Sequence, residues 1–382
     1  MNAQEAQLHY PFGDKLPPSG GALEVAPGVK WLRMRLPFAL DHINLWLLRD
    51  ALPGPQGEVQ GWTVVDCCVS RDESKAQWEQ IFASELEGLP ILRVIVTHMH
   101  PDHIGLAYWL CERWNAPLWI SATDYNAARI GTQSSTGFGG ASAADFFALH
   151  GLSDPLYLEQ IRGRANYYPG LVPRVPERFH RMMEGQVIAI GGRNWTCISG
   201  YGHAPEHIAL SCDDLSFAPT QPTAAAPQEG ATEQDAARRP ARLLISGDMI
   251  LPRISTNVSV YDVEPESNPL TLFLQSIDKF LPLHADTLIL PSHGKPFHGL
   301  HTRIAQLQAH HRDRLAEVLQ ACSAGPCSGA DILPVMFKRP LDVHQTTFAL
   351  GEAVAHLHTL WFEGKLKRLL GSDGVYRFQV CS

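Results

Sequence analysis

The sequence lacks any apolar run of the roughly 18 or more residues that a membrane-spanning helix needs. Its opening residues, Met1 to Ala6, also lack the basic segment followed by an apolar segment that marks a secretory signal peptide. We therefore expect no membrane partner, and we expect the protein to be cytoplasmic.

The cysteines do not form a disulfide framework. There are eight of them in 382 residues, and no two have the C-x-x-C spacing of a redox or metal pair. They include two adjacent residues, Cys67 and Cys68. We expect most of the eight to be small, buried apolar side chains.

An excess of positive charge is also missing. The 31 Lys and Arg residues are outnumbered by 39 Asp and Glu residues, which gives a formal net charge of −8. This balance provides no general attraction to nucleic acid or to anionic membranes. We therefore expect a small-molecule substrate and do not expect nucleic acid as a partner.

The chain does contain a dense group of metal-ligand side chains directly after a predicted buried strand, residues 92–97. They are His98, His100, Asp102 and His103. Side chains two residues apart in an extended segment point the same way, so His98 and His100 can bind one metal ion. Asp102 and His103 lie beyond the bend and can bind a second ion. An isolated histidine in a strand is usually a core residue, but four ligand-type side chains in this spacing predict a metal site.

Four further Asp and His residues each follow a β-like apolar run, which is where a sheet presents side chains to a cleft. They are Asp66, His203, Asp248 and His293. Two other histidines, His42 and His207, are candidates for supporting roles near these positions.

The chain contains the pattern His-x-His-x-Asp-His at residues 98–103, with Asp66 before it and His203, Asp248 and His293 after it in this order. This order resembles the metallo-β-lactamase superfamily over roughly residues 30–300. The resemblance implies one metal ion held by His98, His100 and His203, and a second held by Asp102, His103 and His293. It further implies that Asp248 bridges the two ions and that Asp66 orients a ligand histidine.

The resemblance also implies a hydrolytic reaction at two divalent ions. Imidazoles with two carboxylates suit zinc, and they also accept iron or manganese. Hydroxide generated at the ions would attack the carbonyl of a small ester or thioester, as in glyoxalase II-like members, with Asp102 and Asp248 as the catalytic carboxylates. No motif identifies the basic residues with which glyoxalase II binds glutathione.

Two other functions use the same ligands and remain open from the sequence. One is a single-strand endoribonuclease similar to β-lactamase-like protein 2, against which the acidic net charge counts. The other is a lactonase or β-lactamase.

The strand and helix patterns predict an α/β fold, and the resemblance implies the αββα sandwich for a catalytic domain of residues 1–300. Within it, residues 131–184 form an aromatic- and Met-rich insertion, which could be a substrate wall, a small separate core or a homodimer contact. Residues 218–240 are rich in Ala, Pro and Gln and predict a flexible loop. Residues 254–257 are expected to face the cleft.

Residues 301–382 are expected to form a mainly helical, winged-helix-like domain. A helix predicted at 346–362 is followed by a hairpin predicted at 365–380. Several side chains of this region are predicted to be exposed on its helices: Glu352, His356, His358, Thr359, Glu363, His310 and His311. Because the exposed face of the helix at 346–362 would attract phosphate poorly, we expect a structural or substrate-framing role.

Overall fold

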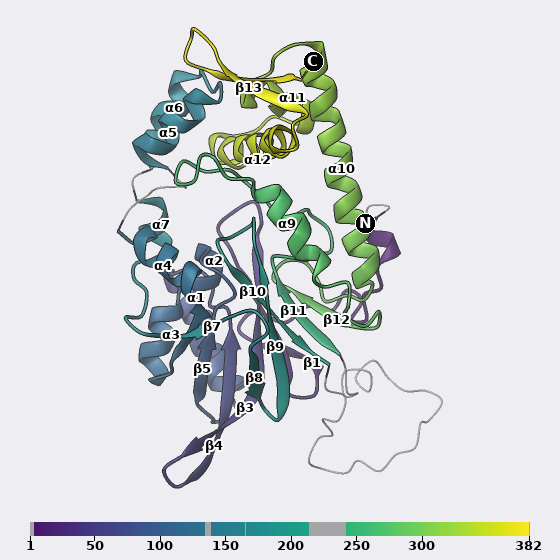
Figure 1. Ribbon diagram of the computed structural model, residues 1–382. Coiled ribbons are helices and arrows are strands. Elements are labelled where there is room, and N and C mark those ends of the chain that lie inside the picture. Colours follow the sequence, from purple (N-terminus) through teal and green to yellow (C-terminus); the bar gives the residue numbers. More distant parts are fainter. Residues whose placement is uncertain (1–3, 134–138, 165, 214–241, 382) are drawn as a thin grey trace.

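The computed structural model describes residues 4–133, 139–164, 166–213 and 242–381, and two β-sheets face each other at its centre (Figure 1). The first sheet has seven strands in chain order, antiparallel up to β4 and parallel from β4 to β7. They are β1 (Ala22–Ala26), β2 (Val29–Arg35), β3 (His42–Gly54), β4 (Gly57–Val65), β5 (Ile91–Ile95), β6 (Leu118–Ser121) and β7 (Phe179–Met182).

The second sheet has five strands in the order β12-β11-β10-β9-β8. They are β8 (Val187–Ile190), β9 (Arg193–Gly200), β10 (His207–Cys212), β11 (Leu243–Gly247) and β12 (Leu288–Pro291). Only β11 and β12 pair in parallel within this sheet. The loop predicted at 218–240 lies outside the described residues.

The two-residue period of the strands places one set of side chains between the sheets and the other set under helices. Trp31 and Trp46 are cross-strand partners that face the second sheet and pack with Trp195. Their neighbours Leu32 and Leu45 are also partners, but they belong to the core on the opposite face of the first sheet. Both faces of the sheet are therefore buried.

Helices cover the outer face of each sheet (Figure 1). On the first sheet they are α1 (Asp72–Ser84), α2 (Pro101–Ile104), α3 (Ala107–Trp114) and α4 (Ala122–Gly131); on the second they are α9 (Pro269–Asp278) and the first half of α10 (Leu300–Ala324). Gly105, between α2 and α3, lets the chain pass close to the first sheet, because a Cβ atom there would lie 2.6 Å from the carbonyl oxygen of Cys68. The predicted α/β fold of layered sheets and helices is confirmed.

The aromatic insertion does not form a core of its own. It contains α5 (Gly140–Leu149), α6 (Pro155–Arg162) and α7 (Tyr167–Leu171). Phe146 and Phe147 pack in the same core as Leu350 and Val354 from near the carboxyl end. Tyr168 joins the core of the first sheet instead, and its hydroxyl donates a hydrogen bond to the carbonyl of Met99.

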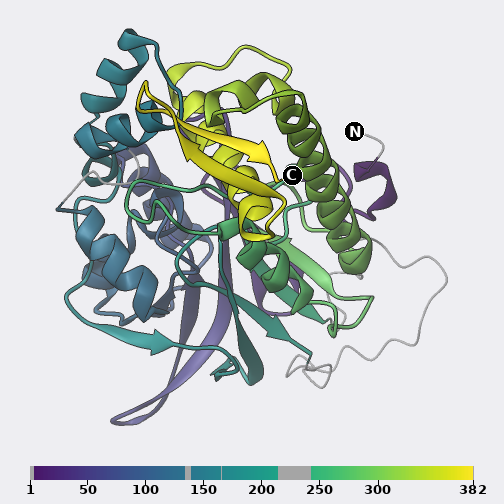
Figure 2. The same cartoon turned by 45° about the horizontal axis from the view of Figure 1, so that its top comes forward.

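The carboxyl-terminal region consists of helices followed by a hairpin. After α10 come α11 (Gly329–Met336), α12 (Val343–Phe362), β13 (Leu366–Leu370) and β14 (Tyr376–Val380). Figure 2 shows the hairpin lying across α12. Val318 and Cys322, in the second half of α10, pack with α11, α12 and the hairpin, so α10 contributes to two cores.

The face of this last helix that was predicted to be exposed is so only in part: Glu363 is exposed and Glu352 is partly buried. His356, His358 and Thr359 are buried, because α12 is packed on several sides: His358 hydrogen-bonds to the carbonyl of Ser267, and Thr359 donates to Asn268. His311 is buried as well, with its Nδ1 3.3 Å from Nε2 of His356. Amphipathic spacing identified the helix but could not show how many neighbours would surround it.

The amino-terminal segment begins with a 3₁₀ turn, η1 (Glu5–Gln7), and then pairs through His9 with His298. Among the described residues, no helix has both the length and the apolar character needed to cross a membrane.

Candidate metal centre

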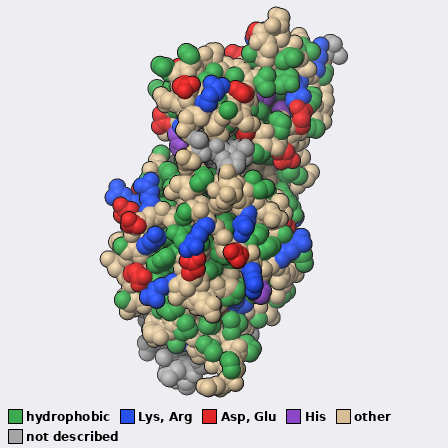
Figure 3. Space-filling model, turned by 90° about the vertical axis from the view of Figure 1, so that its left-hand side faces the viewer, with side chains coloured by type: hydrophobic (Ala, Val, Ile, Leu, Met, Phe, Trp, Pro, Cys, Tyr) green, Lys and Arg blue, Asp and Glu red, His purple; other side chains and the backbone are tan. Residues whose placement is uncertain are grey.

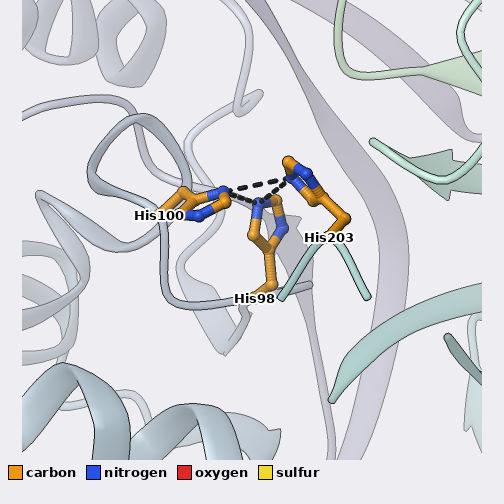
Figure 4. A group of neighbouring side chains, drawn as sticks. All are labelled: His98, His100 and His203. Carbon is orange, nitrogen blue, oxygen red and sulfur yellow. Dashed lines mark hydrogen bonds between the residues drawn. The ribbon is translucent and has the colours of Figure 1, made fainter. Parts of the chain in front are cut away.

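Three histidines converge at the ends of two strands, one from each sheet. His98 and His100 follow β5, and His203 follows β9. Nε2 of His98 lies 2.9 Å from Nδ1 of His100 and 3.2 Å from Nε2 of His203, and the remaining separation is 3.1 Å. Figure 4 shows the three rings pointing toward one another.

These separations fit three ligands of one metal ion with tetrahedral coordination. Nitrogen ligands at the usual zinc distance lie about 3.3 Å from one another around a tetrahedron. Burial, together with the neighbouring imidazoles, holds the pKa of His98 and of His100 well below the ordinary value. Both rings are therefore neutral near pH 7 and have lone pairs available for a metal.

A second group lies beside the first. Nε2 of His293 is 3.4 Å from Oδ2 of Asp102, and Nε2 of His103 is 3.7 Å from the same oxygen. Asp102 and His103 belong to the short helix α2, whereas His293 follows β12. These three side chains again form a set that can hold one ion.

Asp248 follows β11 and faces both groups. Its Oδ1 lies 3.6 Å from Nε2 of His103 and 3.4 Å from Nε2 of His293. Its Oδ2 lies 3.2 Å from Nε2 of His203. The two oxygens of one carboxylate are thus directed at different sets of ligands.

Two buried atoms of the centre lack a hydrogen-bond partner in the described part of the chain, and these are Nε2 of His103 and Oδ1 of Asp248. Burial favours the neutral forms of both groups. Nevertheless the carboxylates around His103 raise its pKa well above the ordinary value, while His293 and His103 hold that of Asp248 well below it. A buried polar atom without a hydrogen-bond partner destabilises the fold. These two atoms therefore fit residues that ligate a cation.

The structure brings Asp66 next to the candidate ligand His103. Its Oδ2 lies 2.8 Å from Nδ1 of His103, which leaves Nε2 of that ring facing the centre. Asp66 also accepts hydrogen bonds from the backbone and the hydroxyl of Thr97. Its φ of 63° is unusual for a residue with a side chain, so the surrounding structure holds this carboxylate in a strained conformation.

Backbone carbonyls orient two other histidines in the same way. Nδ1 of His203 donates to the carbonyl of Asn257 at 2.7 Å, and Nδ1 of His293 donates to that of His42 at 2.8 Å. In each ring Nε2 is then left to face the centre. His42 therefore lies beside the site, and residue 257 supports it through the backbone.

His207 supports the loop that contains Asp248. It is fully buried, and burial lowers its pKa to about 3. The neutral ring accepts a hydrogen bond at Nε2 from the backbone N–H of Asp248, 3.2 Å away. Gly247 makes this approach possible, since its φ is +53° and a Cβ there would lie 2.0 Å from that nitrogen.

Asp124 is a supporting residue that the sequence analysis missed. Its carboxylate accepts hydrogen bonds from the backbone of Met99, between His98 and His100, and from the backbone of Glu206. Burial raises its pKa to about 6. The available signal was Ser121, three residues earlier, because Ser-x-x-Asp is typical of the start of a helix, and Ser121 is the N-cap of α4.

The cysteines contribute no candidate ligand. Cys67 and Cys68 follow Asp66 but lie in the core of the first sheet, and burial raises the pKa of Cys68 to about 12. The prediction of mainly buried cysteines is confirmed, since six of the eight are buried. None of the metal-binding groups formed by the described residues includes a sulfur atom.

A cavity of about 470 Å³ opens beside His100 and His203. Its walls come from α4, from the loop after β9 and from the segment between β11 and α9. The lining side chains include Met99, Ile130, Tyr261, Val263, Glu264 and Leu272. Of the described residues in the insertion at 131–184 only Gly131 lines this cavity, and none of residues 254–257 does. The carbonyl of Asn257 contacts His203 from outside the cavity lining.

Two regions of the chain match known family models. Residues 42–222 match the metallo-β-lactamase superfamily, and residues 315–381 match the metallo-β-lactamase-like, C-terminal domain. A comparison with curated proteins gives no match.

Solved structures resemble the whole chain. The crystal structure of a β-lactamase domain protein from Burkholderia ambifaria is 52% identical in sequence, with a TM-score of 0.86 and 100% of both chains covered. A metallo-β-lactamase family protein from Thermus thermophilus is 23% identical, with a TM-score of 0.68, and the alignment covers 93% of this chain and 99% of that one. The second likeness concerns the fold alone.

Proposed function

The chain belongs to the metallo-β-lactamase superfamily of hydrolases, and from this premise we propose that it hydrolyses a small ester or thioester at a centre of two divalent ions. His98, His100 and His203 would hold one ion, and Asp102, His103 and His293 would hold the other. Zinc is the proposed metal, because the donors are imidazoles and carboxylates, although iron or manganese would also suit them.

The position of Asp248 is the observation that supports a binuclear centre most strongly. One carboxylate oxygen faces His203 of the first group, and the other faces His103 and His293 of the second. A carboxylate shared in this way keeps two cations close together and offsets part of their mutual repulsion.

Two bound divalent ions would supply a water molecule of lowered pKa and polarise a substrate carbonyl. The chain's own contribution is to hold the ligands. Asp66, the carbonyl of Asn257 and the carbonyl of His42 each hold one histidine by Nδ1 and direct its Nε2 inward. Mutation of such a partner typically lowers metal affinity or activity by about 10- to 100-fold.

The surroundings favour a small uncharged substrate over RNA. No Lys or Arg is among the described residues that line the cavity. On the face drawn in Figure 3, Lys and Arg side chains lie among Asp and Glu side chains. Among the described residues, Arg174 pairs with Glu112, and Arg113 pairs with Glu79. A phosphodiester chain requires unpaired positive charge along its path.

We further propose that residues 301–382 form a winged-helix-like module that frames the centre. Three helices followed by a hairpin is the order of such modules. Glu352 of α12 accepts a hydrogen bond, at 3.4 Å, from the side chain of Asn257, whose carbonyl holds His203. The module would thereby contribute to the position of a metal ligand.

The experiment that tests this function is free-thiol release from a panel of acyl-glutathione and acyl-CoA thioesters by the zinc-loaded protein. We expect turnover by the parent and none by Asp248→Ala. Cleavage of single-stranded RNA with no thioester turnover would support the endoribonuclease alternative, and opening of acyl lactones alone would support the lactonase. Either result would overturn the proposal.

A further inference from the structure

The cavity beside His100 and His203 is lined mainly by apolar side chains, and its inner end is the metal centre. Its volume of about 470 Å³ lies within the usual range for small-molecule sites, about 300–1,000 Å³. Met99, which lies between two candidate ligands, contributes to this inner end. A molecule that reaches the ions from this side would therefore contact apolar surface first.

Three large apolar side chains on the walls of this cavity are exposed to solvent. Ile130 is 61% exposed, Val263 is 62% exposed and Leu272 is 45% exposed. They come from α4, from the segment after β11 and from α9, so the fold gathers them from distant parts of the sequence. Exposed apolar side chains that converge on a concavity are typical of a binding site.

The charges of the lining side chains indicate which kind of molecule would bind in this cavity. Among the described lining residues outside the metal centre, Glu264 is the only one with an ionisable carboxylate, and no cationic side chain is present. An anionic group would lose its hydration in the cavity without gaining an ion pair, and Glu264 would repel it. An uncharged apolar group loses little hydration and gains contact area.

A second concavity shares Ile130 with this cavity but is otherwise lined by different residues. It has a volume of about 630 Å³ and lies on the outer surface of α3 and α4. Its lining includes Arg129 and Arg174 with Glu112 and Glu177, and it contains none of the candidate metal ligands. A group bound there would therefore contact none of the candidate ligands.

We propose that the cavity lined by Ile130, Val263 and Leu272 is the acyl subsite, and that it selects substrates with an uncharged, aliphatic acyl group of medium length. This inference rests on the proposed function, since it names the part of the ester or thioester that the protein recognises. The carbonyl carbon would lie at the inner end, near His100 and His203, and the acyl chain would extend outward along the apolar walls.

The first test is a chain-length series of acyl thioesters, from acetyl to decanoyl, with one leaving thiol. In the parent, kcat/KM should rise by about threefold for each added methylene until the cavity is filled. In the double variant Ile130→Asn and Val263→Asn, the gain should fall below about twofold per methylene. The control is Val187→Asn, because Val187 is similarly exposed, at 56%, and does not line the cavity. It should keep the parent's dependence on chain length.

The second test measures binding without turnover. Octanamide, an uncharged compound that is not a thioester, is titrated into the zinc-loaded protein by calorimetry. Binding by the parent and by Val187→Asn, weakened by about tenfold or more in the double variant, would support the subsite. Equal binding by the parent and the double variant would overturn it. A parent that binds octanamide but hydrolyses no thioester would refute the proposed function and leave the apolar site intact.

Discussion

At the scale of single residues, Asp248 lies between the two groups of candidate ligands. Most metal-binding carboxylates in proteins serve one ion. Asp248 instead has histidines of different groups 3.2–3.6 Å from its two oxygens. Its backbone N–H is held by His207, so the carboxylate has little freedom to turn away.

Substituting Asp248 should therefore affect both ions. We expect Asp248→Ala to lower turnover by at least about 100-fold, since even residues that only orient a ligand are worth 10- to 100-fold. We also expect the zinc content after gel filtration to fall from two ions per chain to one or none. The measurement is metal analysis by mass spectrometry alongside the thioester assay.

The matched control is Asp145→Ala. Asp145 is exposed and paired with Arg162, far from the centre in the fold. It should keep two zinc ions and full turnover. An Asp248→Ala protein that retained two ions and normal activity would refute the bridging role.

At the scale of elements, the candidate ligands lie where strands end. β5, β9, β11 and β12 are each followed at once by residues of the centre. A strand holds its last residues firmly through the ladder of backbone hydrogen bonds, while the following loop is free to direct side chains into a cleft. This arrangement explains how residues from both sheets reach one point.

The position of Asp248 next to His207 requires the left-handed backbone conformation of Gly247. We expect Gly247→Ala to destabilise the fold by more than the approximately 1–2 kcal/mol that a left-handed conformation costs an alanine. The added Cβ would lie 2.0 Å from Nε2 of His207 and would displace the ring that holds Asp248. Zinc content should fall as well. Thermal unfolding and metal analysis measure the two effects.

Gly185 offers a close comparison. It also has a positive φ, +71°, but nothing lies within 4 Å of the position of its Cβ. Gly185→Ala should therefore lose only about 1–2 kcal/mol and keep its zinc. Equal effects of the two substitutions would mean that the contact with His207 is unimportant.

At the scale of the whole molecule, buried histidines join the carboxyl-terminal helices to the sandwich. His150, His311, His356 and His358 are almost fully buried. Burial lowers the pKa of His150 and of His311 to about 3 and that of His356 to about 4, and it also lowers the pKa of His358. These four side chains are therefore neutral in the folded protein at neutral pH.

We expect the fold to lose stability as the pH falls below about 6.5, the pKa of a histidine in the unfolded chain. The unfolded state then binds protons that the folded state does not, so the stability is fully present above pH 6.5 and is lost below it. Between pH 7.5 and 5.5, His150, His311 and His356 should each account for about 1.4 kcal/mol of this loss. Urea unfolding at the two pH values measures this loss.

The variant His356→Gln isolates one of these groups. It should lose about 1.4 kcal/mol less than the parent over the same interval. His301→Gln changes an exposed histidine on α10 and should behave like the parent. The explanation would fail if His356→Gln kept the parent's full pH dependence.

The sequence by itself determined the order of strands and helices and most of the candidate ligands. The reason is that these signals are local. The alternation of strands and helices predicted layered sheets and helices, and residues 98–103 lie so close together that their division into two groups follows from backbone geometry. Asp66, His203, Asp248 and His293 were recognisable because each ends an apolar run.

Tertiary structure alone decided which atoms meet and which surfaces are covered. The orientation of Asp248 depends on His207 and His293, and the wall of the cavity depends on Ile130, Val263 and Leu272. On the face of α12 that was predicted to be exposed, His358 and Thr359 are buried by contacts with residues about 90 positions away. Burial is a property of all neighbours together, and no periodicity within one segment encodes it.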